Sequence, residues 1–389
     1  MVKDGTGRVS LLAIFLPFVR LGFTGFGGPA MVPYIKELAV GRKAWLDEQS
    51  FRAGVVLCQT IPGATAMQAA AYVGLRVRGI LGGLAAYIGF GLPAFLLMLV
   101  LTAIYLHTRE LPVTTSLFAG LRVVVVAIVA NATVDFGRSS IKRVPDGVIA
   151  ALAAVALAPP LKMNPIAVIV ICGVLGCLLL KEEGSGAGPG AADPWRAIRP
   201  ALLLVALGAV AIAALYGLDS DLFALTTAML RVDLFAFGGG FASAPLMHHE
   251  VVNVHGWMDA RTFLDGMALG QVTPGPLAIT ATFVGYLVKG FLGATVATIG
   301  VFAPSFGILA LVLPVFDRLQ TWALFRRAMR GALLAFVGLL AATTVRFSFD
   351  VSWSLAAALI GIAAFTALRR KVDIIWVVLA AGLLSALFL

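Results

Sequence analysis

An arginine and a run of glycines stand close together in the first apolar stretch of the chain. Arg20 is followed by Phe23-Thr24-Gly25-Phe26-Gly27-Gly28-Pro29. On a helix, Arg20, Thr24 and Gly27 share one face. A guanidinium near a glycine break can bind an oxyanion together with backbone N–H groups, because glycine permits close approach and the N-terminus of a half-helix is positive. Arg20, Thr24, Gly27 and Gly28 are therefore expected to contact an anion.

The same arrangement occurs a second time. Arg231 precedes Phe235-Ala236-Phe237-Gly238-Gly239-Gly240 at the same helical spacing, so Arg231, Gly238 and Gly239 form a second expected set. An arginine at membrane depth costs at least about 2.5–3.5 kcal/mol and needs a partner. Two alternatives stay open: the arginines are structural, with Asp233 as the near partner of Arg231, or the glycines only allow close helix packing.

Two proline–glycine breaks supply further polar groups. They read Gln59-Thr60-Ile61-Pro62-Gly63-Ala64 and Gln271-Val272-Thr273-Pro274-Gly275-Pro276. Proline interrupts a helix and then fits the first turn of the next one, which leaves N–H groups after the break unpaired. A simple kink, satisfied by its own side chains, is the alternative. Gln68 is a further candidate, and the residues expected to complete the anion site are Gln59, Thr60, Gly63, Gln271, Thr273 and Gly275.

The remaining polar residues indicate no enzyme chemistry. Arg122 opens an apolar span and is expected to snorkel to the interface. His248-His249-Glu250 lies in a polar segment, which favours a solvated face over metal or proton work. The sequence contains no phosphate-binding P-loop, no nucleophile–histidine–acid set and no metal-ligand spacing, and its three cysteines fall in apolar runs. We expect a protein that is not an enzyme and uses no cofactor or metal.

The composition is typical of a membrane protein. Of the 389 residues, 60% are hydrophobic and 12% are charged, whereas soluble domains have roughly 45–50% and about 25%. Continuous apolar runs predict an all-α polytopic protein and exclude an alternating β-barrel. The net charge of +10 fits basic loops that set topology, so no nucleic-acid partner is expected.

Residues of the same type recur in order after 211 or 212 positions. Glycines alone could match by chance in a Gly-rich chain, but arginine, tryptophan, glutamine and proline in the same order indicate a duplication. The matched pairs include Arg20 and Arg231, Gly74 and Gly285, Pro93 and Pro304, Trp45 and Trp257, and Gln59 and Gln271.

The duplication predicts four parts along the chain. About thirteen apolar segments are expected, and the two copies begin seven crossings apart. Because seven is odd, the copies are inverted relative to each other, a transporter architecture with its site near the bilayer midplane. The parts are an N-terminal repeat at 1–180, a Gly-rich linker at 181–197, a linking span at 198–220 and a C-terminal repeat at 221–389.

The distribution of lysine and arginine predicts a cytoplasmic N-terminus. The basic loop 36–52 is an exception if every apolar segment crosses the membrane. If the broken segments are re-entrant half-helices, which enter and leave the membrane on one side, the loop lies on the cytoplasmic side and follows the rule. The segments expected not to cross as simple helices are 10–34, 51–73, 221–246 and 262–287.

Several of these motifs together resemble the chromate ion transporter family over nearly the whole chain. They are the doubled Phe-Gly-Gly stretch, the Gln-x-x-Pro-Gly break, the following Gly-x-x-x-x-Gly and the long span with a central proline. The chain departs from the family pattern at Pro62-Gly63-Ala64, where Pro-Gly-Pro is expected, and at Gly240, where the first copy has Pro29. The two halves therefore need not contribute equally to the site.

The resemblance implies an exporter of chromate in the inner membrane that confers chromate resistance by efflux. Sulfate is a chemically similar oxyanion, and the lipid bilayer is the other partner. The driving force is the membrane potential or a coupled ion. A transporter for sulfate or another oxyanion, an anion channel with the same half-helix site, and assembly as a homodimer all stay open at this point.

A cysteine at Lys43, in a variant whose Cys58, Cys172 and Cys177 are alanine, tests the re-entrant arrangement. We expect a membrane-impermeant thiol reagent to label this cysteine only from the cytoplasmic side. The reason is that the re-entrant segments on either side of loop 36–52 enter and leave the membrane on that side. A cysteine at Arg370 is the cytoplasmic control. Labelling of the position at Lys43 from the outside alone would contradict the arrangement.

Overall fold

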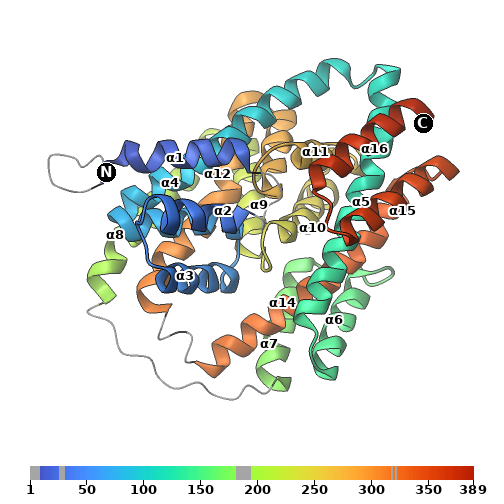
Figure 1. Ribbon diagram of the computed structural model, residues 1–389. Helices are drawn as coiled ribbons and strands as arrows, with labels where there is room; N and C mark the ends of the chain where they lie inside the picture. The colour runs from blue at the N-terminus through green and yellow to red at the C-terminus, as the bar shows by residue number, and fades with distance from the viewer. Residues whose placement is uncertain (1–8, 26–30, 181–193, 317–318, 320–321) are drawn as a thin grey trace. The chain divides into compact units, whose positions relative to one another are not determined.

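The protein is built almost entirely of helices (Figure 1). The structure, a computed structural model, describes residues 9–25, 31–180, 194–316, 319 and 322–389, without the side chains of 194–197. Two compact units result, and each takes segments from both halves of the sequence. Unit 1 is Met1–Val100, Gly188–Gly240 and Thr273–Arg318, and unit 2 is Leu101–Ala187, Phe241–Val272 and Leu319–Leu389.

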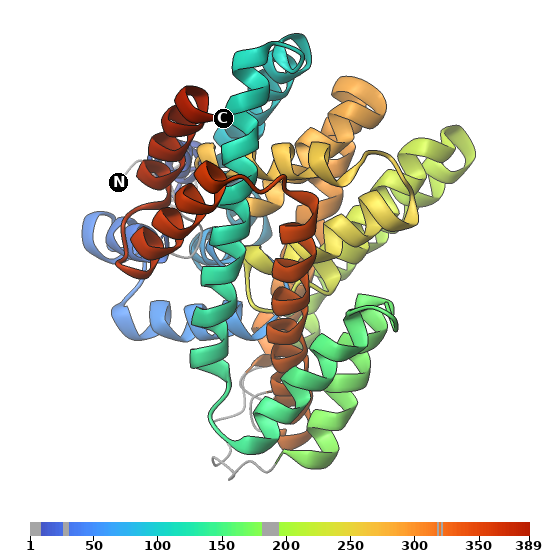
Figure 2. The same cartoon turned by 90° about the vertical axis from the view of Figure 1, so that its right-hand side faces the viewer.

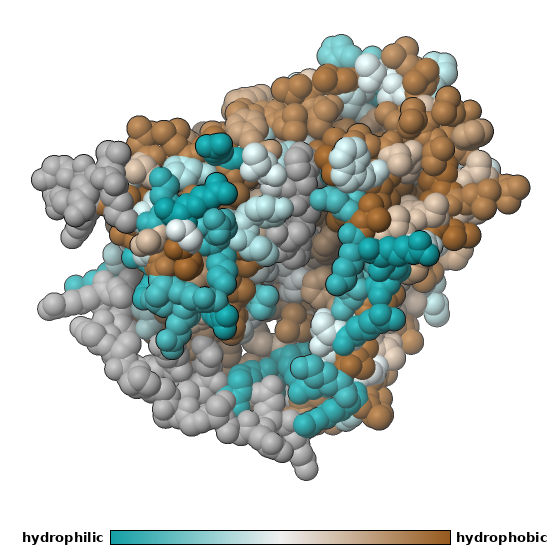
Figure 3. All heavy atoms as spheres, viewed as in Figure 1, coloured by the Kyte–Doolittle hydropathy of each residue, from teal (hydrophilic) through white to brown (hydrophobic). Residues whose placement is uncertain are grey.

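Long apolar helices make this a multi-pass membrane protein. Exposed apolar side chains cover much of the face seen in Figure 3, and Leu218, Phe349 and Leu355 are each at least 80% exposed. Such extended apolar surface is stable in lipid and not in water. Five described helices are long and apolar enough to cross a bilayer: Thr65–Thr108, Pro112–Ser140, Ile198–Leu218, Leu277–Val315 and Ala323–Asp350.

Unit 1 contains both proline–glycine breaks. Proline and glycine end α3 and separate it from α4, as the sequence predicts. The elements of unit 1 are α1 (Leu11–Thr24), α2 (Val32–Lys36), η2 (Glu37–Arg42), α3 (Glu48–Thr60), most of α4 (Thr65–Thr108), α8 (Pro194–Leu218), α9 (Ser220–Leu234), η5 (Leu277–Ile279), α12 (Thr280–Val312) and η6 (Leu313–Val315).

Helix α4 folds back on itself at a glycine. Gly79 has φ 62° and ψ −154°, which only glycine adopts without strain. A Cβ on Gly74 would overlap the backbone of Gly82, although residues eight apart on a straight helix are separated by about 12 Å. The two arms of α4 therefore pack as a hairpin. They touch backbone to backbone because both contact positions are glycine.

Helix α12 repeats this hairpin. Gly290 has φ 59° and ψ −147°, and Gly285 packs against Gly293 as Gly74 does against Gly82. Each bend is held by a basic residue that precedes its glycine. Arg78 donates to the carbonyl of Val9 at 2.7 Å, and Lys289 pairs with Asp219 at 3.1 Å and with Asp221 at 3.2 Å.

Unit 2 is organised around two long helices, α5 and α14, which run side by side (Figure 2). The hydroxyls of Thr133 and Thr344 meet between them at 3.2 Å. Helix α14 packs on α6 and α7, and α5 packs on α15 and α16. The elements are α5 (Pro112–Ser140), α6 (Val144–Leu157), α7 (Pro165–Leu179), α10 (Ser243–His248), η4 (His249–Val254), α11 (Ala260–Val272), α14 (Ala323–Asp350), α15 (Leu355–Arg369) and α16 (Ile374–Phe388).

Small residues let these helices approach closely. Gly331 on α14 packs against the backbone of Cys172 and Gly176 on α7. On α5, the N–H of Gly120 donates to the Ser385 hydroxyl of α16 at 2.9 Å. Close approach of backbones and a side-chain hydrogen bond at the contact are the usual means of helix association in lipid.

Replacing Gly285 by leucine tests the hairpin of α12. The added side chain would overlap the backbone of Gly293, and overpacking of this kind costs about 1–3 kcal/mol or more. We expect a lower melting temperature in detergent and loss of monodisperse protein. Gly208→Leu is the matched control, since no atom lies within 4 Å of its Cβ position. Equal stability of the two variants would contradict the packing argument.

Candidate anion site

Both helix breaks are tied to the glycine stretch of the opposite half of the chain. The N–H of Gly63, in the first break, donates to the carbonyl of Ala236 at 3.0 Å. The N–H of Gly275, in the second break, donates to the carbonyl of Gly25 at 3.0 Å. All four residues belong to unit 1. We call this pair of hydrogen bonds the crossing.

The crossing corrects one expectation about the break glycines. Gly63 and Gly275 were expected to offer free N–H groups, but both N–H groups already have carbonyl partners. The reason is that a buried backbone donor must be paired, and the opposite loop supplies the acceptor. Their φ values of 116° and 117° show why glycine is needed there. They shape the backbone, and any free donors lie elsewhere.

The stretch Gly238–Gly240 lies between the starts of two helices. A Cβ on Gly239 would be 3.3 Å from the hydroxyl of Thr65, the first residue of α4. A Cβ on Gly240 would be 3.7 Å from the backbone nitrogen of Leu277, the first residue of η5, which leads into α12. The N-terminal ends of these two helical stretches therefore converge on the glycines. Such ends carry unpaired N–H groups and positive partial charge, which favours an anion.

The threonines before the breaks bond to their own helices. Thr24 donates to the carbonyls of Arg20 at 3.2 Å and Leu21 at 3.3 Å. Thr60 donates to the carbonyl of Val56 at 2.7 Å. Both hydroxyls are therefore used within their own helices and do not contribute to an anion site in this structure.

The other predicted residues are spread over different surroundings. Arg20 and Gln59 are exposed, Arg231 is half-buried on α9, and Thr273 is buried. Gln271 lies in the last turn of α11 in unit 2, where its Nε2 is buried and has no hydrogen-bond partner. Gly27 and Gly28 lie outside the described residues. The predicted residues that the structure brings together are Gly63, Gly238, Gly239 and Gly275.

A buried polar cluster beside the crossing escaped the sequence analysis. Asp233 Oδ2 accepts the backbone N–H of Ser305 at 2.7 Å. The Tyr87 hydroxyl donates to the carbonyl of Phe302 at 2.7 Å and lies 2.9 Å from the Ser305 hydroxyl. A Cβ on Gly63 would overlap the Ser305 side chain. The sequence feature that could have indicated the cluster is Pro304. A proline within a helix removes a backbone hydrogen bond, and nearby polar groups satisfy the carbonyl that is left unpaired.

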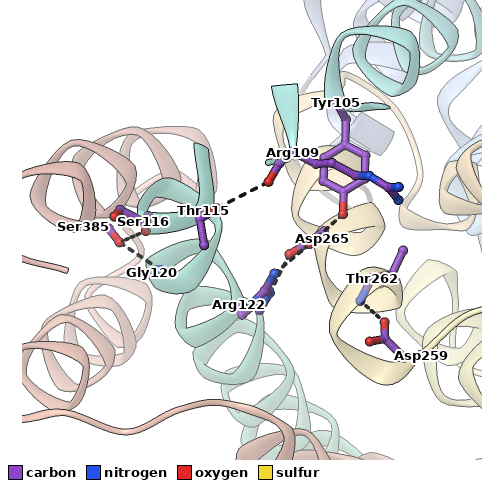
Figure 4. A network of polar contacts seen from close by, with 10 residues as sticks. All are labelled: Tyr105, Arg109, Thr115, Ser116, Gly120, Arg122, Asp259, Thr262, Asp265 and Ser385. Carbon is purple, nitrogen blue, oxygen red and sulfur yellow. Dashed lines mark hydrogen bonds and ion pairs between the residues drawn. The ribbon is translucent and has the colours of Figure 1, made fainter. Parts of the chain in front are cut away.

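Unit 2 holds a second buried network, at Arg122 (Figure 4). The guanidinium of Arg122 binds both carboxylate oxygens of Asp265, at 2.6 and 2.8 Å. Tyr105 donates to the same carboxylate at 2.9 Å. The expectation that Arg122 snorkels to the interface is therefore wrong. A bidentate ion pair satisfies the guanidinium inside the unit, where Asp265 is 2% exposed.

A model of one protein family matches the chain in two places. The family is described as "Chromate transporter", and the matched residues are 12–177 and 223–386. No solved structure matches the chain.

Two named relatives match over most of the chain, and a third matches less than half of it. An uncharacterized transporter of Methanocaldococcus jannaschii is 45% identical over 354 residues, which cover 90% of this chain and 87% of the relative. The chromate transport protein of Pseudomonas aeruginosa is 30% identical over 354 residues, covering 85% of this chain and 80% of the relative. A shorter uncharacterized transporter of Bacillus subtilis is 28% identical over 166 residues, covering 42% of this chain and 84% of the relative.

Replacing Asp265 by asparagine tests the pair with Arg122. Removing one partner leaves an uncompensated buried charge, which costs about 3–5 kcal/mol. We expect a lower free energy of unfolding in detergent. Glu48→Gln is the control, because its pairs with Lys36 and Arg52 are solvent-exposed and worth about 0–1 kcal/mol. A stability loss at Asp265 no larger than that at Glu48 would contradict the assignment.

Proposed function

The chain belongs to the chromate transporter family, and we propose that it exports chromate from the cytoplasm. Chromate is a tetrahedral dianion, which suits a site made of positive helix ends and backbone donors. The observation that carries the proposal is the convergence of the α4 and η5 starts on Gly239 and Gly240. Export across the cytoplasmic (inner) membrane would confer resistance to chromate.

We propose that the chain is an inverted repeat of two copies, 1–180 and 221–389. The two family matches, at 12–177 and 223–386, support this division. So do the hairpins at Gly79 and Gly290, which have nearly the same backbone angles and lie 211 positions apart. The crossing gives further support, because each break bonds to the other half's loop in the same way. A two-fold relation between the copies accounts for all of these features at once.

Anion binding is assigned to the crossing and its surroundings. Chromate would accept hydrogen bonds from the first-turn N–H groups of α4 and from the backbone of Gly238 and Gly239. Thr65 supplies a hydroxyl at the same place. Arg231 and Arg20 contribute positive charge along the path of the anion, since both belong to helices that end at the glycine stretches. The break glycines hold the two loops in place.

The membrane potential is sufficient to drive export. Moving one charge across 100 mV releases about 2.3 kcal/mol. A dianion that leaves a negative cytoplasm therefore gains about 4.6 kcal/mol per 100 mV. We assign the N-terminus to the cytoplasmic side, because most basic loops then face inward. Sulfate has the same charge and shape, so the same site would accept it as a competitor.

Chromate uptake by everted vesicles tests this proposal. We expect saturable uptake that sulfate inhibits, and at least about a tenfold loss in Arg20→Ala and Arg231→Ala, equivalent to about 1.4 kcal/mol of lost binding each. Arg370→Ala is the control, an exposed arginine in the turn after α15.

Two results would contradict the assignment. Normal uptake in both arginine variants would place the anion elsewhere. A flux that rises linearly with chromate concentration and never saturates would indicate a channel in place of a transporter.

A further inference from the structure

Asp233 differs from the other buried acids in the part of the chain that the structure describes. Asp265 pairs with Arg122 at 2.6 Å and Asp146 with Arg330 at 2.8 Å. Glu250 lies 3.8 Å from the His255 ring. Asp233 is 3% exposed, and its partner is Ser305, whose backbone N–H it accepts. Among the buried acids of the described residues, Asp233 alone has no basic side chain within ion-pair distance.

The groups that face Asp233 do not neutralise it. Helix α12 presents Ser305, and α4 presents the Tyr87 phenol, which is near enough to the Cys58 thiol of α3 to interact with it electrostatically. Helix α8 packs on α9, but its described titratable side chains, Arg199 and Tyr216, are exposed. Arg231 lies two positions before Asp233, and two positions on a helix differ by about 200°.

An orphaned acceptor lies next to the same cluster. Gln68 is fully buried, and its Nε2 donates to the carbonyl of Pro62 at 2.6 Å. Its Oε1 is buried and has no hydrogen-bond partner. A Cβ on Gly63 would lie 2.9 Å from the Gln68 Nε2 and would overlap the Ser305 side chain, so Gly63 separates the two groups. A buried acceptor without a hydrogen-bond donor therefore lies beside the cluster.

The acid and the hydroxyl of the cluster, Asp233 and Ser305, have no polar counterparts in the first half of the chain. Gly22 and Ala94 stand 211 positions before Asp233 and Ser305. Gly22 packs directly on Pro93, and Ala94 lies 3.0 Å from the Cβ position of Gly275. The first half thus has the same packing at these points but no carboxylate or hydroxyl. A polar cluster that packing does not require indicates a separate chemical task.

A carboxylate in these surroundings favours a proton. Burying an unpaired ionised carboxylate costs several kcal/mol, and a bound proton removes that cost. A metal ion would need several oxygen ligands, whereas one Asp233 oxygen already accepts the Ser305 N–H. A proton needs only the remaining oxygen.

We propose that Asp233, with Ser305, Tyr87 and Gln68, forms a proton-binding site that couples proton movement to anion movement. The inference rests on the proposed transport function and adds the coupling ion. An O–H bond forms on the carboxylate when a proton enters from water on one side of the membrane, and it breaks when the proton leaves to the other. Gly63 links the site to the anion, because it touches Ser305 and bonds to Ala236, just before Gly238.

Chromate accumulation in proteoliposomes tests the coupling. The full chain is reconstituted, the membrane potential is clamped at zero with potassium and valinomycin, and a gradient of about one pH unit is imposed. With one proton coupled per anion, the gradient changes steady-state accumulation about tenfold in the wild type. We expect Asp233→Asn to abolish this change while chromate–chromate exchange continues. Asp221→Asn, which changes an exposed acid on the same helix, should retain the change in accumulation. This variant is the control for effects of pH on the protonation of chromate itself.

The outcomes separate this inference from the transport function. Absence of chromate exchange in the wild type would refute the transport function, whereas pH-coupled accumulation in Asp233→Asn would refute only the proton site. A sodium gradient that replaces the pH gradient in the wild type would also refute it.

A second measurement covers the case in which Asp233→Asn fails to fold. Infrared difference spectra of the wild type between mildly alkaline and mildly acidic pH, a range in which exposed carboxylates stay ionised, should show the C=O band of a protonated carboxylic acid. Ser305→Ala should move the midpoint of that band to a different pH, because it removes the hydroxyl beside the carboxylate. No such band in the wild type, or an unmoved midpoint in Ser305→Ala, would overturn the proposal.

Discussion

The fold of unit 1 depends on two backbone hydrogen bonds that cross between the halves of the chain. A helix interrupted within a membrane exposes N–H and C=O groups that lipid cannot satisfy, at several kcal/mol for each group. Here the N–H at each break finds a carbonyl in the loop of the other half. The arrangement is reciprocal, because the break of each half is satisfied by the loop of the other half. The positive φ values of Gly63 and Gly275 allow the backbone at each break to make these bonds.

Much of this arrangement could be predicted from the sequence, because proline and glycine act locally. The positions of the breaks, the glycine stretches and the recurrence after 211 or 212 residues needed no knowledge of the fold. The expected segments end at 73 and 287, just before the hairpins at Gly79 and Gly290, but the backbone conformation of these two glycines was not predicted. A glycine with positive φ cannot be told from an ordinary helical glycine by residue type alone.

The partners of charged residues could not be predicted, because they come from distant segments. Asp233 follows Arg231 so closely that an ion pair was the natural alternative, yet its hydrogen-bond donor is Ser305, 72 positions away. The carboxylate that holds Arg122 is 143 positions away. Sequence proximity on a helix says little about which side chains meet, since neighbouring positions point in different directions. Of the predicted site, the structure brings together Gly63, Gly238, Gly239 and Gly275, whereas Thr24 and Thr60 bond to their own helices.

The reciprocity of the crossing also bears on how such a protein can be assembled and how it could have arisen. A polypeptide with only one half would present a break and a loop but would lack the complementary loop and break. A second copy of itself, placed by a two-fold axis, would supply both. Two half-length chains could therefore satisfy each other before any linker joined them. Once the halves were joined, each was free to diverge, and an acid such as Asp233 could appear on one side alone.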